Sequence, residues 1–114
     1  MNPDLLQAKS YGTEGPLVFV LHCGPAAVGT AAPIALGLAA RFRVIEPFQR
    51  GSSSVALTVA RHVADLDALI EARREPARPV LVGHSWGAML ALAYGAAHPG
   101  RVQALVLRLS RSAA

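Results

Sequence analysis

The sequence predicts an α/β fold in which a parallel β-sheet carries helices on its faces. Two observations lead to this prediction: short apolar runs alternate with longer helical segments, and the connections between them are short. The apolar runs, which are typical of strands buried on both faces, lie at 16–22, 41–47, 79–84 and 101–109. The segments expected to be helices lie between them, at 31–40, 58–75 and 86–98.

Glycine and proline residues mark the limits of the first strands. Gly15 and Gly24 enclose the first apolar run, and Pro47 ends the second. Proline suits the end of a strand because it donates no hydrogen bond to the ladder. A further strand is expected near 5–10, before turn-forming residues at 11–16.

The segment 58–75 shows the clearest amphipathic pattern. Its apolar positions recur at helical spacing, at Val59, Val63, Leu66 and Ile70. Its polar positions are expected to face solvent, and they include Arg61, His62, Asp65, Asp67 and Glu71. The predicted N-cap and the residues that end the segment are Thr58, Pro76 and Pro79.

The composition excludes several classes of protein. With 53% hydrophobic and 16% charged residues among 114, the chain is expected to form a hydrophobic core rather than a disordered tail. The net charge of +4 comes from scattered arginines without an aromatic ladder, so no nucleic-acid partner is expected. Glycine and proline interrupt the uncharged stretch 15–40, so no membrane span is expected. The single cysteine, Cys23, and the lack of a targeting segment favour the cytoplasm.

The segment 83–87, Gly-His-Ser-Trp-Gly, places a serine between two glycines where an apolar strand meets an alanine-rich helix. A Gly-x-Ser-x-Gly turn of this kind exposes the serine hydroxyl, and the flanking glycines, Gly83 and Gly87, are needed because the turn leaves no room for side chains. Ser85 is therefore the candidate nucleophile. The alternative is a tight strand-to-helix turn in which Ser85 only caps the helix.

Two backbone amides are candidates for stabilising an oxyanion near Ser85. Trp86 begins the helix, where free amides and the positive end of the helix dipole point toward Ser85. The loop 22–26 follows the first strand and offers the amide of Gly24, or less readily that of Cys23. The alternative for this loop is a tight turn that only the chain path requires.

Four stretches resemble, in order, the N-terminal half of an α/β-hydrolase of the proline iminopeptidase branch. They are LHCGPA, FQRGSSS, ARHVADLDALIE and GHSWGAMLALAYGAAHPGRVQALVLR. In that family these stretches correspond to the oxyanion loop, a Gln-Arg-Gly turn, the helix before the serine turn, and the serine turn with its helix and next strand. The resemblance covers 17–108, so residues 1–114 are expected to form a single partial hydrolase domain.

The resemblance implies a serine hydrolase that cleaves an ester or amide bond, in a small molecule or a peptide, through an acyl-enzyme at Ser85. The amides of Trp86 and Gly24 would hold the oxyanion. The supporting positions would be Gly83, Gly87, His22, Cys23, Gln49, Arg50 and Gly51. The departures from the family pattern are Cys23 and Ala26 in place of loop glycines, and Phe48 in place of an aspartate.

The chain offers no evident acid and base for Ser85. In this family the chain order is serine, acid, histidine, and no aspartate or glutamate follows Ser85. The only later histidine, His98, is thirteen residues on, about 20 Å along a helix, and is expected to act as a helix C-terminal cation. His84 is expected to point away from Ser85, His62 to be solvated, and His22 to be structural.

The resemblance also implies that the lid and the C-terminal strands of the family are absent, which leaves the strand at 101–109 as an exposed apolar edge. The leading hypothesis is therefore a partial serine hydrolase that is inactive alone. The alternative is a non-catalytic module that binds a partner or self-associates through this edge. A metal site from His22, Cys23 and His84 has no dedicated ligand spacing, so no metal or other cofactor is expected.

Overall fold

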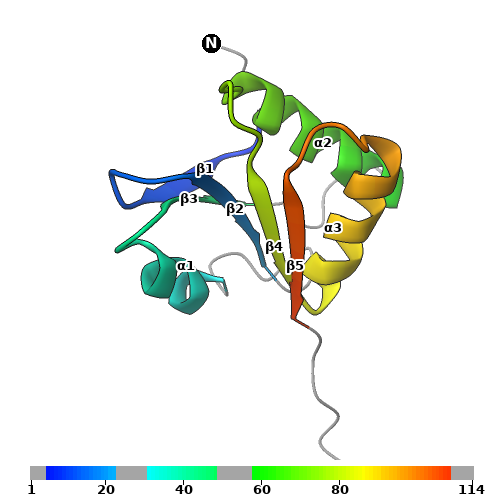
Figure 1. Cartoon of the computed structure of the whole chain (residues 1–114). Helices are drawn as coiled ribbons and strands as arrows, with labels where there is room; N and C mark the ends of the chain where they lie inside the picture. Colours follow the sequence, from blue (N-terminus) through cyan, green and yellow to red (C-terminus); the bar gives the residue numbers. More distant parts are fainter. Residues whose placement is uncertain (1–4, 23–30, 49–57, 109–114) are drawn as a thin grey trace, which may run out of the picture.

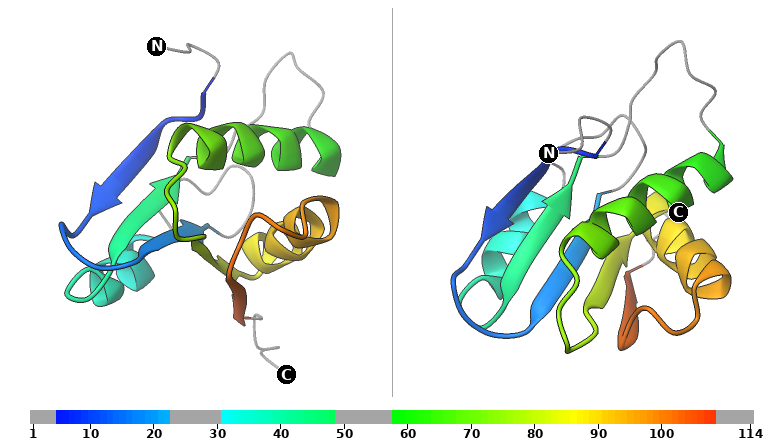
Figure 2. Two further views of the ribbon diagram at one scale, coloured as in Figure 1. Left: turned by 45° about the horizontal axis from the view of Figure 1, so that its top comes forward. Right: turned by 90° about the horizontal axis from the view of Figure 1, so that it is seen from above.

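The computed structural model describes residues 5–22, 31–48 and 58–108 (Figure 1). Five strands form one sheet in the order β1-β3-β2-β4-β5. The strands are β1 (Ala8–Tyr11), β2 (Leu17–Leu21), β3 (Arg43–Pro47), β4 (Val80–His84) and β5 (Ala104–Arg108). The helices are α1 (Ala32–Leu38), α2 (Val59–Ala72) and α3 (Trp86–Ala97). Helices α2 and α3 cover one face of the sheet and α1 covers the other (Figure 2).

Four of the strands are parallel, as the alternation of strands and helices predicts. Strand β2 pairs in parallel with β3 and with β4, and β4 pairs in parallel with β5. Each connection between consecutive strands of this set contains one helix. The predicted α/β fold is therefore confirmed, and the carboxyl ends of these four strands meet at one edge of the sheet.

The first strand adds one antiparallel edge to this parallel sheet. Strand β1 pairs antiparallel with β3, with Tyr11 opposite Val44. It also reaches into the region predicted to be a turn, because Tyr11 is buried and its hydroxyl donates a 2.8 Å hydrogen bond to the fully buried Glu46. The turn follows only after this residue, through Gly12 and Gly15, which both have positive φ.

Two hydrophobic clusters, one on each face of the sheet, hold the helices in place. Phe19 and Leu21 of β2 belong to the cluster under α2 and α3, whereas Val18 and Val20 belong to the cluster under α1. Burial on both faces explains why β2 is an uninterrupted apolar run. The helices contribute to the first cluster through Leu66, Leu69, Ile70, Leu90, Ala91 and Tyr94.

The structure corrects the predicted orientation of α2. Thr58 caps the helix as expected, since its hydroxyl accepts a 3.0 Å hydrogen bond from the Arg61 amide. Val59, predicted to lie in the core, is 44% exposed, whereas His62 and Asp65, predicted to be solvated, are both buried. This side of α2 is buried because α3 packs against it, which covers polar positions such as His62 as well as apolar ones. The buried residues of α2 are His62, Asp65, Leu66, Leu69 and Ile70.

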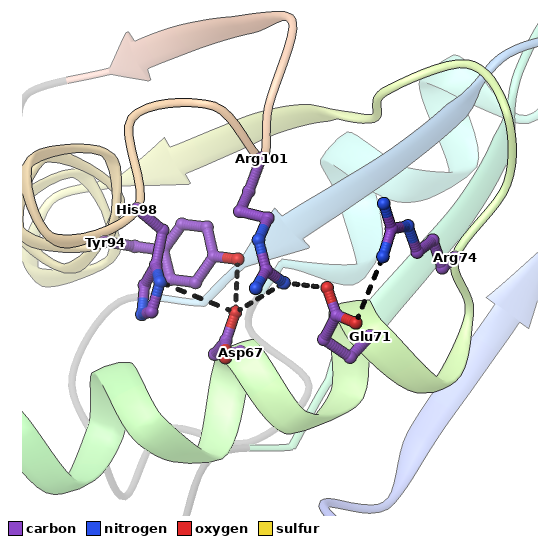
Figure 3. Close-up of polar contacts among 6 residues, drawn as sticks. All are labelled: Asp67, Glu71, Arg74, Tyr94, His98 and Arg101. Atoms are coloured by element: carbon purple, nitrogen blue, oxygen red, sulfur yellow. Dashed lines mark hydrogen bonds and ion pairs between the residues drawn. The ribbon is translucent and has the colours of Figure 1, made fainter.

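Polar contacts join α2 to the C-terminal end of α3 (Figure 3). The Asp67 carboxylate accepts a 2.8 Å hydrogen bond from the hydroxyl of Tyr94 and a 3.3 Å one from Arg101. His98 Nδ1 lies 3.9 Å from the same carboxylate, and Arg101 also pairs with Glu71. Because the ring of Tyr94 is fully buried, its hydroxyl needs this partner, and the contact fixes the spacing of the two helices.

Strand β5 forms one edge of the described sheet, and most of it is exposed. Val106 is 52% exposed and Leu107 is 38% exposed. Successive residues of a strand point to opposite faces, so both faces of β5 present apolar surface. Helix α3, which packs on β5, adds two exposed apolar side chains, Met89 and Leu92.

Both tyrosines of the chain are expected to stay protonated above the pH at which tyrosine ordinarily ionises. Burial and the hydrogen bond to Glu46 raise the pKa of Tyr11 to about 12, and burial and the bond to Asp67 raise the pKa of Tyr94 as well. An ultraviolet titration of the folded protein should show no tyrosinate near pH 10, the usual value. Stability should fall as the pH rises from about 10 toward 12, because the unfolded chain releases these protons first.

The control for this titration is Tyr11→Phe, which should remove one of the two tyrosinate steps and leave the other in place. A tyrosine that ionises near pH 10 while the protein is still folded would contradict the contact made by that side chain.

Candidate functional site

Ser85 occupies the turn between β4 and α3 in a backbone conformation that side chains rarely adopt. Its φ is +57° and its ψ is −114°, and it is the only residue other than glycine with positive φ in the described part of the chain. Its side chain makes no capping hydrogen bond to α3. The alternative, in which Ser85 serves only to cap the helix, requires a hydrogen bond from a helix amide to the Ser85 hydroxyl, and this bond is not formed.

The two glycines of the segment are required by close backbone contacts. A Cβ atom on Gly83 would collide with the carbonyl oxygen of Gly87, and one on Gly87 would collide with the carbonyl oxygen of Leu21. The first turn of α3 therefore lies directly against the carboxyl ends of β2 and β4. This packing gives the physical reason for the spacing of glycine on both sides of Ser85.

Backbone hydrogen bonds fix Ser85 between its neighbours. Its amide donates a 2.8 Å bond to the carbonyl of Arg108 at the end of β5, and its carbonyl accepts bonds from Ala88 and Met89 in α3. The amide of Trp86, at the start of α3, donates to no backbone carbonyl within residues 5–22, 31–48 and 58–108. It is placed where a helix N-terminus favours negative charge.

Of the other predicted site residues, the structure describes His22 but not those of the loops at 23–30 and 49–57. His22 is fully buried at the end of β2, and its carbonyl lies beside Gly87 in the first turn of α3. The chain therefore leaves β2 beside the first turn of α3, and the predicted oxyanion loop that follows stays a prediction. The remaining residues lie outside those that the structure describes, and they are Cys23, Gly24, Gln49, Arg50 and Gly51.

One residue near the turn was missed by the sequence analysis. The ring of His62 on α2 packs edge-on against Trp86, with 5.0 Å between the ring centroids, and only 3% of His62 is exposed. Its spacing from Leu66, Leu69 and Ile70, which are all buried, is the signal that could have placed it in the core. The prediction that His62 is solvated is wrong, because α3 brings Trp86 against it.

The two remaining histidines, His84 and His98, lie just before and just after the turn and helix that carry Ser85. His98 follows the last turn of α3 and packs on Tyr94, with ring centroids 4.9 Å apart, so the length of the helix separates it from Ser85. His84 is half-buried and precedes the turn. Within the three described segments no three His, Cys, Asp or Glu residues form a metal-binding group, and Cys23 lies outside them.

A mostly parallel sheet with a serine in the turn between a strand and the following helix is the architecture of an α/β-hydrolase. The comparisons with known proteins agree with this assignment. Residues 16–113 match the family model of the alpha/beta hydrolase fold, so the chain belongs to this family. The resemblance inferred from the four sequence stretches is thereby confirmed.

Curated relatives include the proline iminopeptidases of Neisseria gonorrhoeae and of Neisseria meningitidis serogroup B. Each is 38% identical over 108 residues, which cover 88% of this chain and 34% of the relative. The chain thus spans about a third of the length of these relatives.

Solved structures of other hydrolases share the fold. A marine microorganism esterase superposes with a TM-score of 0.78 at 28% identity, covering 90% of this chain and 41% of the esterase. The thioesterase domain from the curacin biosynthetic pathway superposes with a TM-score of 0.74 at 31% identity, covering 88% of this chain and 40% of that domain. An epoxide hydrolase from Vigna radiata superposes with a TM-score of 0.75 at 26% identity, covering 88% of this chain and 35% of the epoxide hydrolase.

The substitution Gly87→Ala tests the packing around Ser85. The added methyl group has no room against Leu21, so we expect the free energy of unfolding to fall by about 1–3 kcal/mol, the usual cost of forcing atoms into a packed region. Urea unfolding followed by circular dichroism measures the change.

The matched control is Gly37→Ala in α1, where a Cβ atom would meet nothing within 4 Å. Alanine is favoured over glycine in a helix by about 0.5–1 kcal/mol, so this variant should be as stable as the parent or more so. Equal effects of the two substitutions would contradict the close contact at Gly87.

Proposed function

We propose that this chain carries the nucleophile part of a serine hydrolase active site, with Ser85 as the attacking residue. The observation that carries the proposal is the conformation of Ser85, which is held at φ +57° without a capping role. Such a conformation costs about 1–3 kcal/mol and persists only where the surrounding structure imposes it, and residues of this kind cluster at active sites. Membership of the α/β-hydrolase family supports this reading.

In the proposed reaction Ser85 Oγ attacks the carbonyl carbon of an ester or amide while a general base takes the hydroxyl proton. The carbonyl oxygen becomes an oxyanion, which the Trp86 amide stabilises together with a second donor, for which Gly24 is proposed. The tetrahedral adduct then expels the alcohol or amine, which receives that proton from the base. Water releases the acyl group in a second step of the same kind.

The base and its supporting acid are the parts that this sequence does not provide. No aspartate or glutamate follows Ser85, and His98 lies beside Asp67 at the far end of α3. We propose that both groups come from polypeptide beyond these 114 residues and that the chain alone is inactive. The relatives support this proposal, because the chain covers 34% of a proline iminopeptidase.

The substrate class is proposed from the chemistry and from the relatives together. The similar proteins include a peptidase, an esterase and a thioesterase as well as an epoxide hydrolase. Because the first three are named for cleaving acyl bonds, the proposed substrate is an ester or amide of a small molecule or peptide. No cofactor takes part in this chemistry. Among the described helices none is long and apolar enough to cross a bilayer, and the cytoplasm is proposed from the single cysteine, Cys23.

A second candidate function rests on the edge strand β5. Its exposed apolar residues, Val106 and Leu107, would suit a module that pairs with another strand or with a second copy. Such a module would form a stable dimer and would not react with a serine-directed probe.

A fluorophosphonate probe tests the proposal on two polypeptides, the 114-residue chain and a longer product of its gene that contains a downstream acid and histidine. We expect the longer product to be labelled at Ser85 and the short chain to react roughly 10⁴-fold more slowly, the loss typical of removing triad members. Labelling is measured by intact mass and by a time course.

The control pair is Ser85→Ala, which should abolish labelling, and Ser10→Ala at an exposed serine of β1, which should not. Labelling of the longer product that survives Ser85→Ala would refute the assignment of the nucleophile. A gene without any downstream acid and histidine, together with a dimer that never reacts, would favour the second candidate function.

A further inference from the structure

The edge of the sheet opposite Ser85 holds a second feature, formed at the amino ends of β2, β3 and β4. Two adjoining hollows of about 160 and 180 Å³ lie there and share Leu17, Arg73 and Glu75 in their walls. The charged residues that line them are Arg43, Arg73, Arg74, Arg78, Arg101, Glu71 and Glu75. We call this feature the arginine groove.

The carboxylates of the arginine groove are already engaged. Glu75 accepts two hydrogen bonds from the Arg43 guanidinium, at 2.6 and 2.7 Å. These bonds hold the pKa of Glu75 below its usual range, so this carboxylate is ionised and neutralised by its partner. Glu71 pairs with Arg101 and lies 3.8 Å from Arg74 (Figure 3).

Arg73 and Arg78 are left over from this pairing. Neither forms an ion pair with a carboxylate in the part of the chain that the structure describes. Five arginines line the groove with two glutamates, and Asp67 pairs with one of these arginines, Arg101, from beside it, so the net charge stays positive. Grouping like charges at one concave site raises the local potential and attracts a mobile anion.

The end of α2 is the feature that would oppose an anion here, because helix carbonyls give a C-terminus partial negative charge. Three of those carbonyls have donors, however, because the amide of Arg73 donates to Leu69 and Ile70 and the amide of Arg74 donates to Glu71. The arginine side chains that follow the helix carry full charges and outweigh the partial ones.

We propose that the arginine groove is a binding site for a small oxyanion with two negative charges, such as a phosphate group, held by Arg73 and Arg78. Guanidinium groups present planar pairs of donors that match phosphate oxygens. Each hollow is smaller than the roughly 300 Å³ at which pockets for drug-sized ligands begin, so the site suits an anionic group rather than a large molecule. The site is separate from Ser85 and independent of the proposed hydrolysis.

Inorganic phosphate is the probe for this site, added to the ¹⁵N-labelled 114-residue chain at low salt and followed by backbone and arginine side-chain NMR shifts. We expect saturable shifts confined to the groove, and binding about tenfold weaker in Arg73→Gln/Arg78→Gln because two charge-assisted donors are lost. Chloride at equal ionic strength should not reproduce the shifts.

The matched control is Arg41→Gln/Arg108→Gln, which removes the same charge from exposed positions outside the groove. It should retain the affinity of the parent, and circular dichroism should show both double variants to be folded. Shifts that do not saturate, or an equal loss of affinity in the two double variants, would overturn the proposal.

Discussion

The close approach of α3 to the ends of β2 and β4 is the constraint on which the rest of the structure depends. Gly83 and Gly87 permit it, because any side chain at either position would meet a backbone carbonyl. The chain can enter α3 at this distance only through a sharp turn, and Ser85 carries the resulting positive φ. The packing of α3 on the sheet therefore determines the backbone conformation of Ser85.

The surrounding elements keep that turn in place. Strand β2 is buried on both faces and lies at the centre of the sheet, so it gives α3 a rigid support. The contact between Asp67 and Tyr94 holds α2 against α3 at the far end, and the contact between His62 and Trp86 does so near the turn. These contacts hold β2, α2 and α3 together around the turn that carries Ser85.

Sequence patterns predict the local features of this structure and miss those that depend on distant neighbours. The apolar runs locate β2 and β4, and the spacing of the glycines locates the turn at Ser85, because backbone sterics act over a few residues. The contact of Tyr11 with Glu46 and that of His62 with Trp86 join residues that are remote in the sequence. Periodicity cannot reveal such partners. The roles expected of Gly24 and of 49–51 remain predictions.

The strain at Ser85 can be measured directly by comparing Ser85→Gly with Ser85→Ala in urea unfolding. Glycine adopts positive φ without steric cost, whereas the Cβ atom of alanine makes this conformation unfavourable. We expect the free energy of unfolding of the glycine variant to be about 1 kcal/mol higher than that of the alanine variant, despite the greater entropy that glycine loses on folding. An alanine variant as stable as the glycine variant, or more so, would contradict a strained turn at Ser85.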